Sequence, residues 1–118
     1  MNYPELCLAY LKCYETKNLP AIAELFDEHI TLRDWNILVR GKELALAETH
    51  KNFVSVETIA IQPLHFYHNA TTVAAELKIT LNGTDELFVV DVITFTESGK
   101  IQSIRAYKGR GDAEIPHA

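Results

Sequence analysis

Basic clusters, long apolar runs and targeting signals are all missing from this sequence. Its 11 Lys and Arg are scattered among 16 Asp and Glu, and the formal net charge is −5. Nucleic-acid-binding proteins carry a basic patch or stripe, so nucleic acid is not expected as a partner. No stretch approaches the roughly 18 apolar residues of a membrane span, and the first residues lack the features of a secretory signal. We therefore expect no membrane association and a cytoplasmic protein.

Motifs that bind metals or phosphates, or that activate nucleophiles, are also missing. His65 and His68 have a spacing that suits a metal on a helix, but on a strand residues three apart point to opposite faces. There is no glycine-rich phosphate loop, nucleophile elbow or cysteine-rich zinc spacing. Cys7 and Cys13 lie on different sides of a predicted helix and cannot form a disulfide there, so they are interpreted as apolar fillers. We expect no metal and no other cofactor.

The sequence does contain enough apolar material for one globular domain. Of its 118 residues, 47% are hydrophobic. No polar or glycine-rich stretch is long enough to mark a linker between two units. We predict a single domain over residues 1–109 and a polar tail over residues 110–118.

Three helices are predicted, over residues 4–17, 20–27 and 42–53. Pro4 and Pro20 suit the first turns of the first two helices, and apolar residues recur along both at helical spacing. The third helix is rich in Ala, Leu, Glu and Lys, which are strong helix formers.

Five strands complete the predicted order α-α-β-α-β-β-β-β, which is an α+β fold. From Val56 onward apolar positions recur every second residue, the period of a strand. Turn sequences such as Asn82-Gly83 separate the runs. The predicted strands span residues 30–34, 56–67, 72–81, 86–96 and 100–108.

The predicted strand over residues 86–96 is apolar on both faces. Its reverse face carries Phe88, Val90 and Val92. Because helices can cover only one side of a single curved sheet, we expect a second copy of the chain to cover the other side. The sequence therefore predicts a homodimer formed through the outer face of the sheet.

Two aspartates lie on strand faces that otherwise carry apolar side chains. Asp34 shares a face with Leu32, and Asp91 lies between Val89 and Ile93. Burying an ionised carboxylate costs several kcal/mol, so such a group must be paired, hydrogen-bonded, neutral or beside a cavity. The two aspartates are therefore the best candidates for chemistry.

Each aspartate has two interpretations. Asp34 is either an acid or base in a pocket, or a residue at a strand end that ties down the following loop. Asp91 is either a neutral carboxyl that donates a hydrogen bond, its pKa raised by desolvation, or a structural carboxyl satisfied by Arg105 or by a backbone group.

Tyr10 adds a third candidate, on the apolar stripe of the first helix. Alone it is either a core residue or a site residue, because a buried phenol usually finds a hydrogen-bond partner. Together with Asp34 and Asp91 it supplies one base and two donors. That set is the minimum for removing a proton next to a carbonyl group while stabilising the enolate oxygen.

The element order and two segments resemble the NTF2-like superfamily, in the branch of SnoaL-like proteins and ketosteroid isomerases. The segments are AELFDEHITLRD at residues 23–34 and DVITFTESGKI at residues 91–101. The resemblance extends from about residue 4 to residue 109. It implies a curved antiparallel sheet folded around three helices into a cone with an internal apolar pocket, usually dimeric through the sheet.

The resemblance also implies roles for individual residues. Asp34 falls at the position of the catalytic base, and Tyr10 and a protonated Asp91 fall at the oxyanion hole of ketosteroid isomerases. The base is followed here by Trp35 instead of proline, and Thr49 or a neighbour replaces the tyrosine that supports the oxyanion hole. We expect the substrate pocket to be lined by Trp35, Phe26, Val89 and Ile93.

The leading hypothesis is an isomerase that moves a proton within an apolar ketone or enone, with an apolar small molecule as its ligand. Two alternatives remain open. One is a non-catalytic module that binds an apolar ligand. The other is a different SnoaL-like enzyme, such as a polyketide cyclase, dehydratase or epoxide hydrolase. Epoxide hydrolysis would need Arg105 to point into the cavity, whereas strand alternation puts Arg105 outside.

Overall fold

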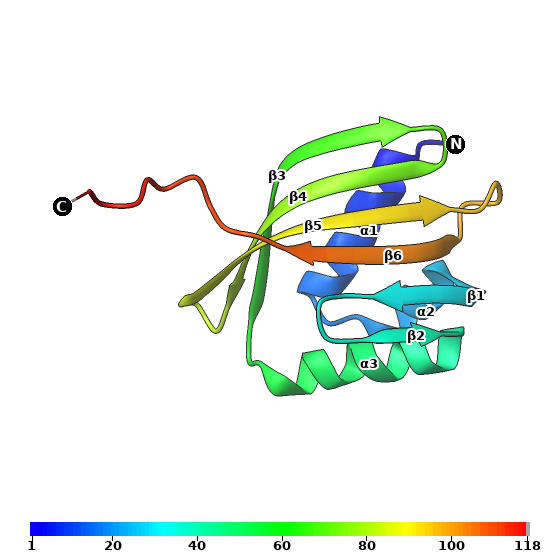
Figure 1. Cartoon of the computed structure of the whole chain (residues 1–118). Helices are drawn as coiled ribbons and strands as arrows, with labels where there is room; N and C mark the ends of the chain where they lie inside the picture. The colour runs from blue at the N-terminus through cyan, green and yellow to red at the C-terminus, as the bar shows by residue number, and fades with distance from the viewer. Residues whose placement is uncertain (118) are drawn as a thin grey trace.

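The computed structural model describes residues 1–117 and contains three helices and one six-stranded sheet (Figure 1). The helices are α1 (Tyr3–Glu15), α2 (Leu19–Leu25) and α3 (Lys42–Ser55). The strands are β1 (Phe26–Arg33), β2 (Leu38–Arg40), β3 (Ile59–Asn69), β4 (Thr72–Leu81), β5 (Asp85–Phe95) and β6 (Ile101–Lys108). This confirms the predicted α+β class. No helix of the described part of the chain is both long and apolar enough to cross a membrane.

Side-chain caps fix where the first two helices begin. The Asn2 side chain accepts a hydrogen bond from the backbone N–H of Glu5 at 3.0 Å, and Asn18 accepts one from Ala21 at 3.2 Å. Asparagine is favoured at this position because its side-chain oxygen satisfies a backbone N–H that has no partner within the helix. Helix α3 begins instead after Gly41, whose φ of 98° is a conformation that favours glycine.

The sheet has the strand order β2-β1-β6-β5-β4-β3. Strands β3 to β6 follow one another as antiparallel neighbours, while the β1–β2 hairpin is added beside β6. Strand β1 lies parallel to β6, so one pairing departs from the antiparallel sheet that was expected. Figure 1 shows the sheet curving around α1, with α3 running along the β1–β2 end.

The predicted boundaries were least accurate around the first hairpin. Strand β1 begins at Phe26 instead of Ile30, because Phe26 already pairs with Ile101 of β6 and leaves helical geometry there. Strand β2 lies in a segment that was predicted to be a loop. Its three residues pair with residues 31–33 of β1, a tertiary contact that so short a run does not reveal.

The Asn82-Gly83 turn is confirmed. Asn82 and Gly83 have φ values of 54° and 74°, and Thr84 N–H bonds to Leu81 C=O at 3.1 Å. Two successive positive φ values are typical of the tight turn that suits the twist of a hairpin. The Asn82 side chain also accepts a hydrogen bond from the N–H of Glu57 at 2.7 Å, which fastens the α3–β3 connection.

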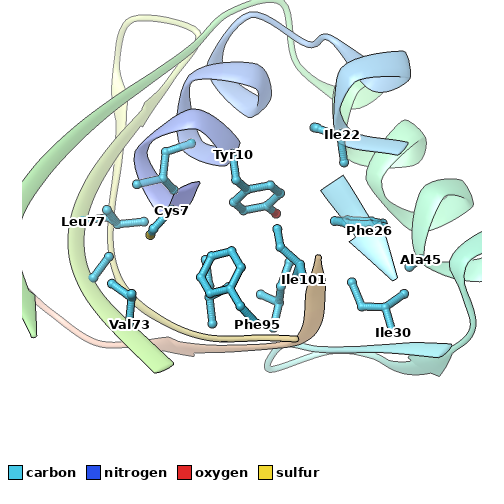
Figure 2. Packing of buried hydrophobic residues seen from close by; sticks show 14 of the residues in the cluster. Cys7, Tyr10, Ile22, Phe26, Ile30, Ala45, Val73, Leu77, Phe95 and Ile101 are labelled. Carbon is cyan, nitrogen blue, oxygen red and sulfur yellow. The ribbon is translucent and has the colours of Figure 1, made fainter. Parts of the chain in front are cut away.

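The core lies between the helices and the concave face of the sheet (Figure 2). Figure 2 shows Phe95 and Ile101 of the sheet beneath Tyr10 of α1, with Phe26 beside them. Cys7 is fully buried in this cluster, and no disulfide joins it to Cys13. Burial, followed by the charge of Asp91, raises the pKa of the Cys7 thiol to about 12. An uncharged thiol is consistent with the predicted role of apolar filler.

Candidate functional site

A cavity of about 230 Å³ opens between the C-terminal half of α1, the end of α3 and the concave face of the sheet. Its walls are mainly apolar. The lining residues with polar side chains include two tyrosines, two aspartates, two asparagines and a serine: Tyr10, Tyr14, Asp34, Asp91, Asn36, Asn52 and Ser55. An apolar hollow with a few convergent polar groups is the usual form of a small-molecule site, although typical sites are larger, at roughly 300–1,000 Å³.

The space around Asp91 comes from the small residues beside it. In the sheet register Asp91 of β5 faces Ala75 of β4 on one side and Ala106 of β6 on the other. Side chains directly opposite on neighbouring strands share a face and lie close together. Methyl groups at both positions leave the carboxyl uncrowded and give it no hydrogen-bond partner.

Asp91 faces the cavity as an unpaired carboxyl. No hydrogen bond or ion pair within residues 1–117 involves its side chain, and Arg105, the partner considered from the sequence, is exposed. Desolvation by burial raises the pKa of Asp91 from 3.8 to about 7. Because no donor within residues 1–117 hydrogen-bonds to the charged form, the neutral acid is favoured below about pH 7, and a neutral acid can donate a hydrogen bond.

Asp34 ties down the loop after β1, as one of its two interpretations proposes, and also lies where the other would need it, at the cavity. Its Oδ1 accepts hydrogen bonds from the N–H groups of Asn36 at 2.7 Å and Ile37 at 2.9 Å, which forms the turn between β1 and β2. The carboxyl also lines the cavity. Since no donor of the described chain bonds to Oδ2, one oxygen shapes the loop and the other remains available.

Tyr10 is 4% exposed and lines the cavity. Its ring packs against those of Phe26 and Tyr14, with centroid separations of 6.2 and 6.0 Å. Burial, and then the charge of Asp91, raises the pKa of Tyr10 well above the usual value. The phenol therefore stays neutral, and it lines the same cavity as Asp91.

Tyr14 is a cavity residue that the sequence analysis did not select. It lies one helical turn after Tyr10 on α1, and its hydroxyl accepts a hydrogen bond from Asn52 Nδ2 at 3.0 Å. Burial, and less strongly the charges of Asp91 and Asp34, raise the pKa of Tyr14, while the bond from Asn52 lowers it. The i, i+4 spacing of the two tyrosines was the feature of the sequence that could have revealed it.

The predicted pocket lining divides into two parts. Trp35 and Val89 line the cavity, whereas Phe26 and Ile93 lie in the packed core and do not line it. Trp35 does not fill the hollow, because its side chain is 45% exposed at the mouth, where Lys108 Nζ lies 5.8 Å from the ring centroid.

Thr49, which stands near the family's supporting tyrosine, donates its hydroxyl hydrogen bond to Ala45 C=O of its own helix at 2.8 Å. It therefore does not support Tyr10. Over residues 1–117, no group of three His, Cys, Asp or Glu side chains is arranged to hold a metal ion.

The fold has many counterparts among solved structures. An NTF2-like protein of unknown function from Cytophaga hutchinsonii is 17% identical, with 92% of this chain and 91% of that one aligned at a TM-score of 0.77. A proposed ketosteroid isomerase from Kribbella flavida is 13% identical, with coverage of 98% and 83% and a TM-score of 0.80. No family model and no curated protein matches the sequence.

A third similar structure has a higher identity. It is the epoxide hydrolase/cyclase-like enzyme SalBIII, which has a role in pyran ring formation in the polyether salinomycin. It is 26% identical, with 91% of this chain and 90% of that one aligned at a TM-score of 0.79. These matches along nearly the whole chain show that the chain has the NTF2-like fold, and SnoaL-like and ketosteroid isomerase-like proteins are among its structural neighbours.

Proposed function

We propose that the protein is an isomerase that moves a proton within a compact apolar ketone or enone. One observation carries the proposal: Asp91 faces an apolar cavity without a partner, and burial raises its pKa to about 7. A purely structural carboxyl would be hydrogen-bonded or paired. A carboxyl held neutral beside a phenol is instead suited to stabilise negative charge that develops on a substrate oxygen.

The proposed reaction uses three side chains. Asp34 Oδ2 removes the proton on the carbon next to the carbonyl group. The electron pair of that C–H bond forms the C=C bond of the enolate, and the π pair of the C=O bond moves to the carbonyl oxygen. Tyr10 and neutral Asp91 donate hydrogen bonds to this oxygen. Asp34 then returns the proton to the far carbon of the dienolate, so the enzyme ends in its starting state and the double bond is conjugated with the carbonyl.

The cavity volume limits the substrate. At about 230 Å³, the cavity is smaller than typical drug-sized sites. The proposal therefore favours a substrate with a single ring or short chain over one that must bury several fused rings. The exposed Trp35 at the mouth offers an aromatic surface to any part of the ligand that extends outside.

The test is the rise in ultraviolet absorbance when a β,γ-unsaturated ketone becomes conjugated, with cyclohex-3-en-1-one and a β,γ-unsaturated 3-ketosteroid as substrates. We expect Asp34→Asn to lower kcat by on the order of 10³-fold or more, because no other group accepts the proton. Asp85→Asn is the matched control, since it removes an exposed carboxyl from β5. Equal rates for wild type and Asp34→Asn would exclude this mechanism, and a ligand bound equally by both without turnover would favour the binding module.

The similarity to SalBIII favours a second candidate, ring closure of an epoxy alcohol. Asp34 would take the hydroxyl proton, the alkoxide oxygen would attack an epoxide carbon, and Asp91 would give its proton to the epoxide oxygen as the C–O bond breaks. Because Arg105 lies outside the cavity, intramolecular attack is favoured over attack by a bound water. Mass spectrometry separates these outcomes, since cyclisation leaves the substrate mass unchanged and hydrolysis adds one water.

We also propose that two copies of the chain associate through the outer face of the sheet. Phe88, Val90 and Val92 are only partly buried there, and Gly111 of the tail lies against the Phe88 ring. These apolar side chains lie beside Glu76, Lys78 and Arg105 on the same face. A partly exposed apolar group with charged neighbours favours a protein partner. Sedimentation velocity tests the proposal, with a dimer expected for the wild type and a monomer for Val90→Glu. A wild type that stays monomeric at high concentration would overturn it.

A further inference from the structure

The hydrogen bond between Asn52 and Tyr14 determines what the Tyr14 hydroxyl can do. Asn52 Nδ2 is the donor and Tyr14 Oη the acceptor, at 3.0 Å. A phenol has one hydrogen to donate in addition to its acceptor lone pairs. Since the bond from Asn52 occupies a lone pair, and no acceptor within the described chain takes the hydrogen, the Tyr14 O–H remains free to donate to a ligand in the cavity that this residue lines.

The end of α1 that carries Tyr14 is firmly attached to the opposite wall of the cavity. The adjacent Glu15 accepts a hydrogen bond from Ile61 N–H at 2.7 Å, and Lys17 donates one to Val56 C=O. The Tyr14 ring packs edge-on against Phe53 with a centroid separation of 4.9 Å. Donors held in place before the reaction stabilise a developing charge without reorganisation. The structure therefore supports Tyr14 as a preorganised group and not as a mobile surface tyrosine.

Tyr14 lines the same cavity as Asp34 and Asp91. In keeping with this shared location, the charges of both carboxyls add to the effect of burial in raising the pKa of Tyr14.

We propose that Tyr14 is a further catalytic residue, which donates a hydrogen bond to the oxyanion alongside Tyr10 and Asp91, and that Asn52 is the positioning residue that turns the Tyr14 O–H into the cavity. This inference rests on the proposed function for its catalytic role. In Δ5-3-ketosteroid isomerases the oxyanion hole consists of one tyrosine and one neutral aspartate. Here Thr49 bonds within its own helix, and the Tyr14–Asn52 pair supplies an additional donor from another direction.

The experiment measures binding of 4-nitrophenolate, a compact oxyanion whose absorbance distinguishes the ionised from the neutral phenol. It is performed in the Asp34→Asn background, because the base is neutral after it has taken the proton. We expect adding Tyr14→Phe to weaken binding by about 10-fold or more, the effect of losing a hydrogen bond to a charged group. Tyr67→Phe is the matched control, since the Tyr67 hydroxyl bonds to Glu76 and lies outside the cavity.

Asn52→Asp tests the positioning role separately. The new carboxylate would accept the Tyr14 hydrogen and turn it away from the cavity, so binding should weaken as much as in Tyr14→Phe. Ser55→Asp controls for the added charge, because Ser55 also lines the cavity but does not bond to Tyr14. Thermal unfolding of each variant confirms that the fold persists.

Two results would overturn the inference. One is binding of 4-nitrophenolate that Tyr14→Phe leaves unchanged. Failure of the Asp34→Asn protein to bind 4-nitrophenolate at all counts as the same result. The other is a loss in Asn52→Asp no greater than that in Ser55→Asp. If only the isomerase proposal fails, the Tyr14 and Asn52 variants still lose binding of the oxyanion, but the wild type converts no unsaturated ketone.

Discussion

The concave face of the sheet has a packed half and a hollow half, and the row Ala75–Asp91–Ala106 lies at their boundary. On one side of the row Val73, Ile93 and Phe95 are at most 1% exposed. On the other side the alternating apolar pattern continues and lines the cavity. Leu77 and Val89, next to the row, are still 1% and 4% exposed, and Ile79, Leu81 and Leu87 beyond them are only partly buried. Alternating apolar residues on the concave face therefore form either packed core or cavity wall, depending on which helices and loops pack over them.

The covering elements explain the difference. Over the packed half, α1 places Tyr3 against Phe95, with ring centroids 5.5 Å apart, and Cys7 is fully enclosed. Over the hollow half, the polar residues Tyr14 and Asp34 face the apolar strands. Asp91 lies where close packing ends, so its carboxyl is desolvated but not crowded. That position accounts for its raised pKa.

The largest expected effect comes from emptying the packed half. Phe95→Ala should lower the free energy of unfolding by about 3–5 kcal/mol, because it leaves a void that the surrounding core cannot refill. The matched change in the hollow half is Leu87→Ala, which should cost about 1 kcal/mol or less because Leu87 already borders open space. Urea unfolding measures both values. Similar costs for the two variants would mean that the two halves do not differ in packing.

An effect of similar size and opposite sign is expected at the boundary. Asp91→Asn should raise the free energy of unfolding at about pH 8 by up to about 4 kcal/mol, because it removes a carboxyl that must ionise while desolvated. The folded pKa of about 7 lies above the value of about 4 in an unfolded chain. The contribution of Asp91 to stability is therefore fully present below about pH 4 and is lost as the pH rises through 7.

Unfolding measured from about pH 4 to pH 8 checks this sign. The difference between wild type and Asp91→Asn should grow as the pH rises. Asp85→Asn is the control on the same strand, and it should show no comparable change because Asp85 is exposed. A constant difference across this range would contradict a raised pKa for Asp91.

The smallest effect on stability is expected from filling the hollow half. Ala106→Leu adds a larger apolar side chain to the cavity beside Asp91, where space is available, so the free energy of unfolding should change by about 1 kcal/mol or less. Ligand binding should nevertheless be lost. Titration with 4-nitrophenolate measures the loss, and undiminished affinity would show that the ligand binds elsewhere.

Local patterns were reliable where each element is defined by its own residues. Strand β4 was predicted with the bounds that the structure has, Thr72–Leu81, because its alternation is regular and turns bound it on both sides. The β1–β2 hairpin was predicted poorly. Strand β2 exists through its pairing with β1, and the turn that forms it depends on Asp34.

The candidate site was predictable to a similar extent. Asp34, Tyr10 and Asp91 stand out as polar groups on apolar faces, and the structure brings all three to one cavity. Phe26 and Ile93 share the same pattern but lie in the core, and Tyr14 was missed. The periodicity of a strand predicts which side chains point inward. It does not predict how closely the helices pack over those side chains.

By itself, then, the sequence determined the elements, the inward faces of the strands and the unusual aspartates, because periodicity and turn residues act over a few neighbouring positions. Only the tertiary structure decided that Ala75 and Ala106 lie on either side of Asp91 and leave open space beside its carboxyl. It also decided that Asn52 donates a hydrogen bond to Tyr14. These contacts join residues that are distant in the chain. A cavity is the volume that packed elements leave unfilled, so it depends on all of them at once.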